Sequence, residues 1–304
     1  MAGAGAVRAV RNRIRSVENA AKVTKAMELV AASKMRRAQE RALAARPYAH
    51  RMQQVLLQLG GSAGGVDTQT LHPLLEEREV RHFAFIHITA DRGLAGGLNS
   101  NMNRAGAALA LEHQPQVERV SVLTVGRKGR DFFRRAGLSM MAEFTAIGDF
   151  PGMEAVLPIT RIVIGDYMSG EVDRVFLGYQ QFVNTAVQQP TFRQILPVRP
   201  PEGGAGEEGE DSAEPVRDYI FEPSPQQLLE TLLPRYVEVQ VFEALLEAAA
   251  SEQSARMVAM RNATDSANAM VDDLKLTYNK ARQELVTSEL LDIVGGKAAL
   301  EQTR

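Results

Sequence analysis

The chain has 304 residues, with 35 Lys and Arg against 37 Asp and Glu, so its formal net charge is −2. Apolar residues make up 45% of the chain and cysteine is absent, which excludes global disorder, a disulfide framework, thiolate metal sites and a cysteine nucleophile. No apolar run approaches the ~18 residues of a membrane span, and we expect no secretory signal at the start.

The near-neutral total hides a strong segregation of charge along the chain. Residues 1–60 carry 12 basic and three acidic groups, a net of +9, and residues 61–201 carry 14 of each sign. Residues 202–222 hold eight acidic groups against one basic group (−7), and residues 223–304 hold 12 against eight (−4). The basic N-terminal segment implies an acidic partner, within the chain or outside it.

The first segment predicts one long helix. Between Gly5 and Gly60 the only helix breaker is Pro47, near which we expect a bend. Apolar residues recur at alternating intervals of three and four, which is typical of a coiled-coil seam. These are Val7, Val10, Ile14, Val17 and Ala21. A helix that runs to about residue 58 spans roughly 80 Å.

The middle of the chain predicts an α/β fold with a small, partly parallel sheet, because strand-like and helix-like segments alternate. The expected strands are 83–89, 120–125, 174–182 and 191–198, and the expected helices are 98–113, 128–136 and 154–168. Residues 200–215 are rich in Pro, Gly and Glu, and we interpret them as a flexible acidic insertion.

The last segment predicts a second long helix. Ser224, Pro225 and Gln227 form an N-terminal capping signature, and Pro234 is the last proline. A helix to about residue 299 spans on the order of 100 Å. Its apolar stripe is Phe242, Leu246, Ala249, Met257, Met260, Thr264, Ala267, Val271, Leu274 and Tyr278. We expect the two long helices to pair as an antiparallel coiled coil, because a domain of ordinary size cannot enclose either.

We find no motif for catalysis or metal binding. The five histidines are scattered, and no metal-ligand spacing, nucleophile elbow or Walker A motif occurs. A glycine-rich turn, Asp91, Arg92, Gly93 to Gly97, follows a strand and could cradle a phosphate. We favour a structural turn, in which Gly93 and Gly97 permit close backbone approach and Asp91 pairs with Arg92. The segment 126–130 (GRKGR) receives the same interpretation.

Two other classes of protein stay open from the residues alone. One is a nucleotide-binding enzyme built on the turn at 91–97. The other is a basic coiled coil that binds nucleic acid, although the basic groups spread around the helix and Tyr48 is the only aromatic residue before residue 60. A membrane-surface helix is disfavoured, because the segment lacks a wide apolar face and interfacial aromatics.

The terminal motifs resemble those of the γ subunit of bacterial F-type ATP synthases. The resemblance runs nearly end to end, through residues 13–17 (RIRSV), 22–35 (KVTKAMELVAASKM), 91–99 (DRGLAGGLN), 251–264 (SEQSARMVAMRNAT), 278–283 (YNKARQ) and 286–292 (VTSELLD). Ala95 replaces a common cysteine and Lys297 a usual small residue. Because the chain has no cysteine, a thiol switch of the chloroplast type cannot operate.

The resemblance implies a non-catalytic rotor without cofactors that couples ion flow through the membrane c-ring to ATP synthesis. A coiled coil of residues 1–60 and 223–304 would turn inside a ring of three α and three β subunits. A Rossmann-like domain of residues 61–222 would lie near the ε subunit and the c-ring. The expected location is peripheral, on the cytoplasmic side of the cell inner membrane, through the complex only and without nucleic acid.

By motif match, Arg282, Gln283 and Thr287 would contact an acidic loop of a β subunit. Lys25 and Met27 would lie near that contact on the facing helix. The foot on the c-ring and ε would be formed by Tyr219, Phe221 and Glu222.

Overall fold

The computed structural model describes residues 2–62, 72–199 and 225–302, which form two compact units. One unit comprises the N-terminal half of the first helix and the C-terminal part of the last, divided at Ala31 and Arg256. The other unit is Ala32–Ala255. The expected acidic insertion at 200–215 and the cap at Ser224 lie outside the described residues.

The two predicted long helices are confirmed. The first is α1 (Ala2–Ser62), which contains Pro47, and the second is α5 (Pro225–Gln302), which contains Pro234. No helix in the described ranges carries an apolar stretch of the length that crossing a bilayer requires.

A five-stranded sheet forms the centre of the unit 32–255, in the order β3-β2-β1-β4-β5. The pairs β3–β2, β2–β1 and β1–β4 are parallel, and the pair β4–β5 is antiparallel. The partly parallel sheet that the sequence predicts is therefore confirmed. The strands are β1 (His82–Ile88), β2 (Arg119–Val125), β3 (Ser139–Phe144), β4 (Arg174–Phe182) and β5 (Gln188–Leu196).

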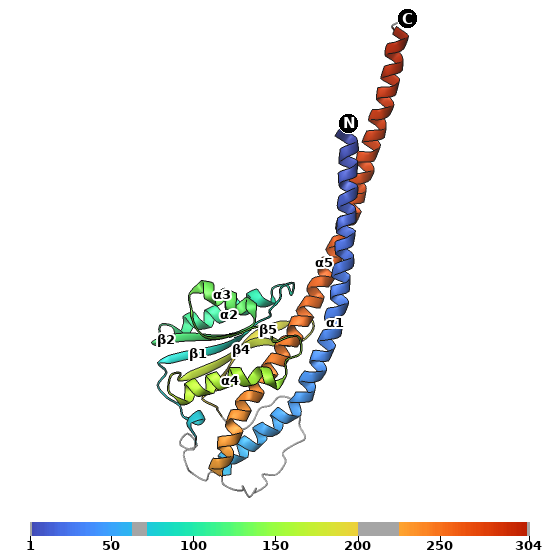
Figure 1. Ribbon diagram of the computed structural model, residues 1–304. Helices are drawn as coiled ribbons and strands as arrows, with labels where there is room; N and C mark the ends of the chain where they lie inside the picture. The colour runs from blue at the N-terminus through green and yellow to red at the C-terminus, as the bar shows by residue number, and fades with distance from the viewer. Residues whose placement is uncertain (1, 63–71, 200–224, 303–304) are drawn as a thin grey trace. The chain divides into compact units, whose positions relative to one another are not determined.

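Helices cover both faces of this sheet (Figure 1). One face carries α2 and α3, and the other carries α4 and α5. The bounds are α2 (Leu98–His113), α3 (Arg127–Ala136) and α4 (Met153–Met168), with a short 3₁₀ turn, η2 (Pro73–Leu75), before β1. The expected helices 98–113, 128–136 and 154–168 thus agree with the structure to within one residue.

The alternation of side chains along β1 builds a separate core on each face. Phe83 and Phe85 lie in a cluster with Phe133 of α3. Ala84 and Ile86 point the other way, into a larger core that includes residues of α4 and α5. Because β1 is buried on both faces, its sequence is almost continuously apolar, as is typical of a central parallel strand.

The strand β3 was not predicted from the sequence, and its position explains why. It lies at the edge of the sheet, and its side chains are half-buried or exposed. Its sequence, SMMAEF, contains no β-branched residue and does not alternate clearly. Its strand conformation is therefore set by pairing with β2 rather than by local preference.

The predicted seam of the coiled coil is confirmed in the unit that joins residues 2–31 to 256–302. The buried and half-buried positions of α1 follow intervals of three and four from Val7 to Ala31, and those of α5 do so from Met257 to Leu285. Thr24 contacts Thr264 through their hydroxyl oxygens, 2.7 Å apart, and Arg11 donates to the Tyr278 hydroxyl. Residue numbers rise on one helix as they fall on the other, so the helices are antiparallel.

Candidate functional site

The C-terminal end of α5 extends beyond its partner helix. Arg11 lies beside Tyr278, so Ala2, nine residues earlier, is level with about residue 287 of α5. The remaining 15 residues, to Gln302, span roughly 22 Å and lie beside no part of α1 that the structure describes. This end is visible in Figure 1, where α5 continues past the N-terminus.

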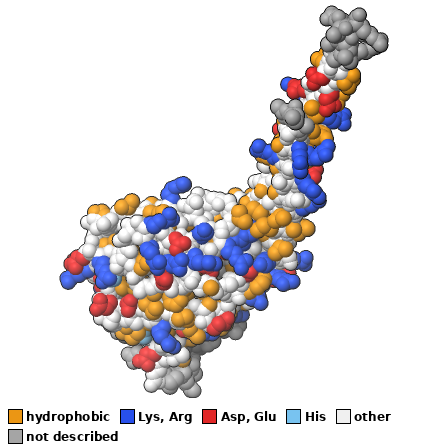
Figure 2. Space-filling model, turned by 45° about the horizontal axis from the view of Figure 1, so that its top comes forward, with side chains coloured by type: hydrophobic (Ala, Val, Ile, Leu, Met, Phe, Trp, Pro, Cys, Tyr) orange, Lys and Arg blue, Asp and Glu red, His pale blue; other side chains and the backbone are white. Residues whose placement is uncertain are grey.

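This extension exposes large apolar side chains. Leu290, Leu291, Ile293 and Val294 are each 57–70% exposed. Apolar side chains gathered on an exposed surface commonly mark a site that a partner covers. Figure 2 shows such side chains alternating with charged ones along the coiled coil.

The predicted β-subunit contacts on α5 are accessible. Arg282 and Gln283 are exposed and lie off the seam, which passes through Ala281 and Leu285. Thr287 is also exposed, and its hydroxyl donates to the Gln283 carbonyl at 2.9 Å. These positions leave the side chains of Arg282 and Gln283 available to a partner.

The expectation that Lys25 and Met27 lie near Arg282 is wrong. The contact between Thr24 and Thr264 places this part of α1 beside residues 261–264 of α5. Arg282 is 18 residues further along α5 than Thr264, which is roughly 27 Å at 1.5 Å per residue. Lys25 is exposed and pairs with Glu28 at 2.9 Å, while Met27 is half-buried, so they form a separate candidate contact.

The foot residues Tyr219, Phe221 and Glu222 lie outside the described residues. Their predicted contact with the c-ring and the ε subunit therefore stays a prediction.

The glycine-rich turn between β1 and α2 is present, but its internal contacts differ from expectation. A Cβ on Gly93 would come no closer than 4.0 Å to Lys128, and one on Gly97 would meet only the Asn101 side chain at 3.4 Å. Neither glycine is therefore needed to let another segment of the chain approach the backbone closely. The left-handed residues of the turn are Leu94 and Gly96, with φ of 62° and 56°.

The expected pairing of Asp91 with Arg92 is replaced by contacts to later segments. Asp91 accepts hydrogen bonds from the main-chain N–H groups of Arg127 at 3.0 Å and Ala146 at 2.8 Å. The Arg127 guanidinium also lies 3.6 Å from its carboxylate. Asp91 thus ties the ends of three strands together, because two main-chain donors from distant segments converge on one carboxylate.

The segment 126–130 does not offer a phosphate site. A phosphate-binding helix N-terminus needs main-chain N–H groups that point at the ligand. Here the first four such groups already donate within the chain: Gly126 to Phe144 O, Arg127 to Asp91 Oδ1, Lys128 to Ala90 O and Gly129 to Thr89 Oγ1, at 2.8–3.2 Å.

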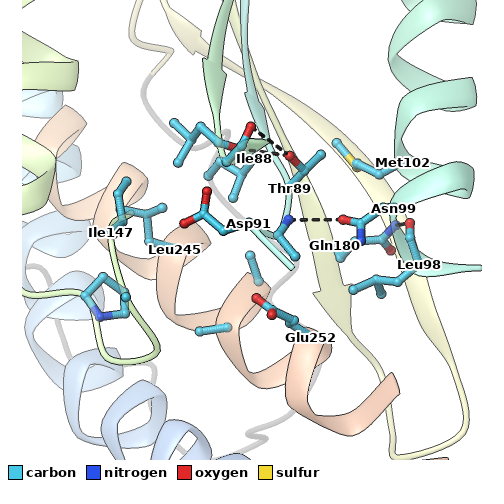
Figure 3. Close-up of a pocket in the computed structure, with 17 residues that line it drawn as sticks. Ile88, Thr89, Asp91, Leu98, Asn99, Met102, Ile147, Gln180, Leu245 and Glu252 are labelled. Carbon is cyan, nitrogen blue, oxygen red and sulfur yellow. Dashed lines mark hydrogen bonds between the residues drawn. The ribbon is translucent and has the colours of Figure 1, made fainter. Parts of the chain in front are cut away.

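The crevice at the carboxyl ends of the strands is filled by α5. In open α/β sheets, ligands bind at the point where the strand order reverses, which here lies between β1 and β4. Figure 3 shows Leu245 and Glu252 of α5 facing the strand end that carries Asp91. The remaining cavity is about 60 Å³, whereas ligand pockets usually measure roughly 300–1,000 Å³. A nucleotide does not fit, so the nucleotide-binding alternative is not supported.

The described residues contain no group of three or more His, Asp or Glu that could hold a metal ion. His87 is fully buried, where Nε2 lies 3.0 Å from Asn103 Oδ1, and burial lowers its pKa to about 4. It is packed against Phe85 and Phe133, so it belongs to the core.

A set of buried polar residues on α5 stands out in the structure but not in the sequence patterns. Ser251, Gln253 and Ser254 are each 0–1% exposed and hydrogen-bond to the end of β4 and to two loops at the carboxyl edge of the sheet. The sequence offered one signal for these residues, because polar side chains that interrupt the apolar stripe of a long helix can indicate buried hydrogen bonds. The motif at 251–264 contains all three.

A family model described as ATP synthase matches residues 6–300. The ATP synthase gamma chain of Dehalococcoides mccartyi (strain ATCC BAA-2266 / KCTC 15142 / 195) is 53% identical over 294 residues, which cover 97% of this chain and 99% of the relative. That of Roseiflexus castenholzii (strain DSM 13941 / HLO8) is 48% identical over 296 residues, covering 97% and 98%.

Solved structures share the fold. The chain is similar to one in the rotor of the Euglena gracilis mitochondrial ATP synthase, with a TM-score of 0.62, 18% identity and coverage of 93% of this chain and 99% of the other. It is also similar to one in the central stalk and c-ring of the Tetrahymena thermophila enzyme, with a TM-score of 0.60, 24% identity and coverage of 79% and 99%.

The structure thus combines two long paired helices with an α/β sheet whose ligand crevice is filled by its own helix. The similarity extends over nearly the whole chain and reaches about half of all positions. The chain belongs to the ATP synthase gamma chain family. It is accordingly a non-catalytic subunit of the ATP synthase, a membrane-associated complex.

Proposed function

We propose that this chain is the central rotor of a proton-translocating F-type ATP synthase. Ion flow through the c-ring would turn the chain, and the asymmetric coiled coil would drive the three catalytic β subunits through their conformations in turn. The chain would pass torque and perform no bond chemistry.

The observation that carries the proposal is the unpaired end of α5. A single helix that exposes Leu290, Leu291, Ile293 and Val294 needs an apolar surround. Burying one such side chain fully is worth roughly 1.5–3 kcal/mol. A narrow apolar sleeve formed by the α and β subunits would supply this burial and still permit rotation, because apolar contact is not directional.

The paired part of the coil supports the same role. A shaft that transmits torque needs helices without breaks, and α1 and α5 are continuous through both units. The basic residues of the N-terminal segment give the shaft a charge that acidic loops of the β subunits can attract. Arg282, Gln283 and Thr287 form one proposed contact with such a loop, and Lys25 with Met27 form another.

The proposal includes the wider assembly. One chain would serve three αβ pairs, with residues 1–60 and 223–304 as the shaft and residues 61–222 as the domain beside the ε subunit and the c-ring. Tyr219, Phe221 and Glu222 would form the foot. The chain would lie on the cytoplasmic side of the inner membrane, attached only through the complex.

Co-expression with the α and β subunits of the same enzyme tests the proposal. We expect purification of a complex with one copy of this chain for three αβ pairs, and ATP hydrolysis that depends on its presence. Failure of the full-length chain to co-purify with α and β would refute the proposal. Tight, salt-sensitive DNA binding by the purified chain would instead favour the nucleic-acid alternative.

The proposed contact at the β-subunit loop has its own test. We expect Arg282→Ala with Gln283→Ala to leave assembly intact and to reduce proton-driven ATP synthesis in membrane vesicles, because both side chains lie off the seam. Lys280→Ala is the matched control, since Lys280 is an exposed basic residue on the same turn of α5. Unchanged synthesis in the double variant would remove these residues from the coupling mechanism.

A further inference from the structure

We infer that Asp149, Ser251, Gln253 and Ser254 form a polar clamp that fixes both long helices to the edge of the sheet, and that torque passes through it. These would be positioning residues for the rotor, so the inference rests on the proposed function. All of the contacts lie within the unit 32–255.

Two buried hydroxyl groups attach α5 to the end of β4 and to the segment that follows it. Ser251 donates to the Gln180 carbonyl, and Ser254 donates to the Thr185 carbonyl, each at 2.9 Å. Both serines are 0% exposed. The Gln180 carbonyl is buried and cannot replace a lost donor with water, whereas Thr185 is exposed and its carbonyl also accepts from Gln188 Nε2 at 3.1 Å. Together the two serine bonds fix the axial position and the rotation of α5 against the sheet.

Asp149 joins three segments of the chain. It lies in the loop between β3 and α4, where one carboxylate oxygen accepts from Lys34 Nζ of α1 at 2.7 Å and the other accepts from Gln253 Nε2 of α5 at 3.2 Å. The next residue, Phe150, lies beneath the Arg41 guanidinium of α1 at 4.8 Å. One loop therefore holds both helices.

The position of the clamp at the carboxyl edge of the sheet indicates how it would resist rotation of α5. The bonds come from the carboxyl edge of the sheet, where related folds bind a ligand and where Leu245 of α5 lines the residual crevice. Apolar packing in that crevice resists separation but opposes sliding and twisting weakly, because it is not directional. Hydrogen bonds and an ion pair have preferred angles, so they resist rotation of α5 against the sheet.

Coupling of the assembled enzyme tests this inference. We expect Asp149→Ala, and separately Ser251→Ala with Ser254→Ala, to assemble and to hydrolyse ATP at nearly the wild-type rate. We expect each to lower ATP-driven proton pumping per ATP hydrolysed several-fold in inverted vesicles. Glu143→Ala is the matched control, since it breaks an ion pair with Arg134 in the same unit that touches neither long helix.

A second measurement separates coupling from stability. Because the chain has no cysteine, Glu112→Cys on the exposed surface of α2 gives a unique attachment point for a bead. We expect wider angular fluctuations of the bead against immobilised α and β subunits in Asp149→Ala. Lys34→Asp combined with Asp149→Lys should restore both the stiffness and the pumping ratio.

The outcomes are distinct. Wild-type pumping per ATP and wild-type stiffness in Asp149→Ala would overturn the inference and leave the proposed function standing. If the serine pair fails to assemble, Asp149→Ala decides the matter, since its side chain is 32% exposed and its loss leaves no buried charge behind. If the unmodified chain itself fails to join the α and β subunits, the proposed function fails first.

Discussion

The buried His87 predicts that the sheet unit loses stability in mild acid. His87 lies on β1 beneath α2 and α3, and its Nε2–H donates to Asn103 Oδ1. The Asn103 amide is oriented by its own bond to the Lys128 carbonyl, and Nδ1 of His87 has no partner among the described residues. Burial lowers the pKa of His87 to about 4, against a smaller opposing effect of the Asn103 bond.

The sign and size follow from proton binding. The ordinary pKa is 6.5, so between that value and about 4 the unfolded chain binds a proton that the folded chain does not. Stability is therefore unaffected well above pH 6.5 and falls as the pH drops below it. The shift, 6.5 − 4 = 2.5 pKa units, corresponds to about 3 kcal/mol at 1.36 kcal/mol per unit. Near pH 5 the loss relative to neutral pH is about 2 kcal/mol.

Urea unfolding of the full-length chain, followed by tyrosine fluorescence, measures this loss. The chain has six tyrosines and no tryptophan, and Tyr167 and Tyr179 are buried in the sheet unit. We expect His87→Gln to reduce the fall in unfolding free energy between neutral pH and pH 5 by about 2 kcal/mol. Leu111→Gln, at an exposed position of α2, is the control and should keep the wild-type fall. Equal pH dependence in wild type and His87→Gln would refute the reasoning.

Three further changes test the packing. Gly126→Ala places a Cβ 2.0 Å from a carbonyl oxygen at the end of β1, at a residue with φ of 93°, and should cost roughly 2–4 kcal/mol in urea unfolding. Tyr167→Phe removes a hydroxyl that donates to the Glu76 carbonyl at 2.6 Å and should cost about 1 kcal/mol by the same assay; no loss would contradict that bond. Thr264→Val removes the hydroxyl contact between the two helices and should lower the melting temperature of the coil, followed by circular dichroism. Adding Thr24→Val should recover part of the loss, because the Thr24 hydroxyl, which also donates to the Ala21 carbonyl at 3.0 Å, then no longer faces an apolar side chain.

The sequence by itself determined the long helices, the seam between them and most of the sheet. These features depend on neighbours in the chain: an interval of three and four from Val7 to Ala21, long stretches with few glycines and prolines, and apolar runs of strand length. The start of the last helix at Pro225 and the bounds of α2 were accurate for the same reason. The edge strand β3 was not, because pairing with β2 overrides its weak local preference.

The tertiary structure alone decided the register of the coil. Both helices have the same period, so the sequence permits several alignments that differ by whole heptads. The contacts of Thr24 with Thr264 and of Arg11 with Tyr278 fix one alignment, which places Lys25 and Met27 roughly 27 Å or more from Arg282. Only the same alignment shows how far α5 extends past α1.

The tertiary structure also decided what the glycine-containing segment 126–130 does. From the sequence, a strand followed by glycines and a helix is compatible with phosphate binding, because the pattern shows where main-chain N–H groups lie but not what they bond. In the fold, those at the start of α3 donate to Asp91, Thr89 and two carbonyls, and α5 fills the crevice. Hydrogen-bond partners from distant segments can be assigned only once the chain has folded. Here these partners occupy the N–H groups that could bind a phosphate, and α5 packs at the edge of the sheet where a ligand could otherwise bind.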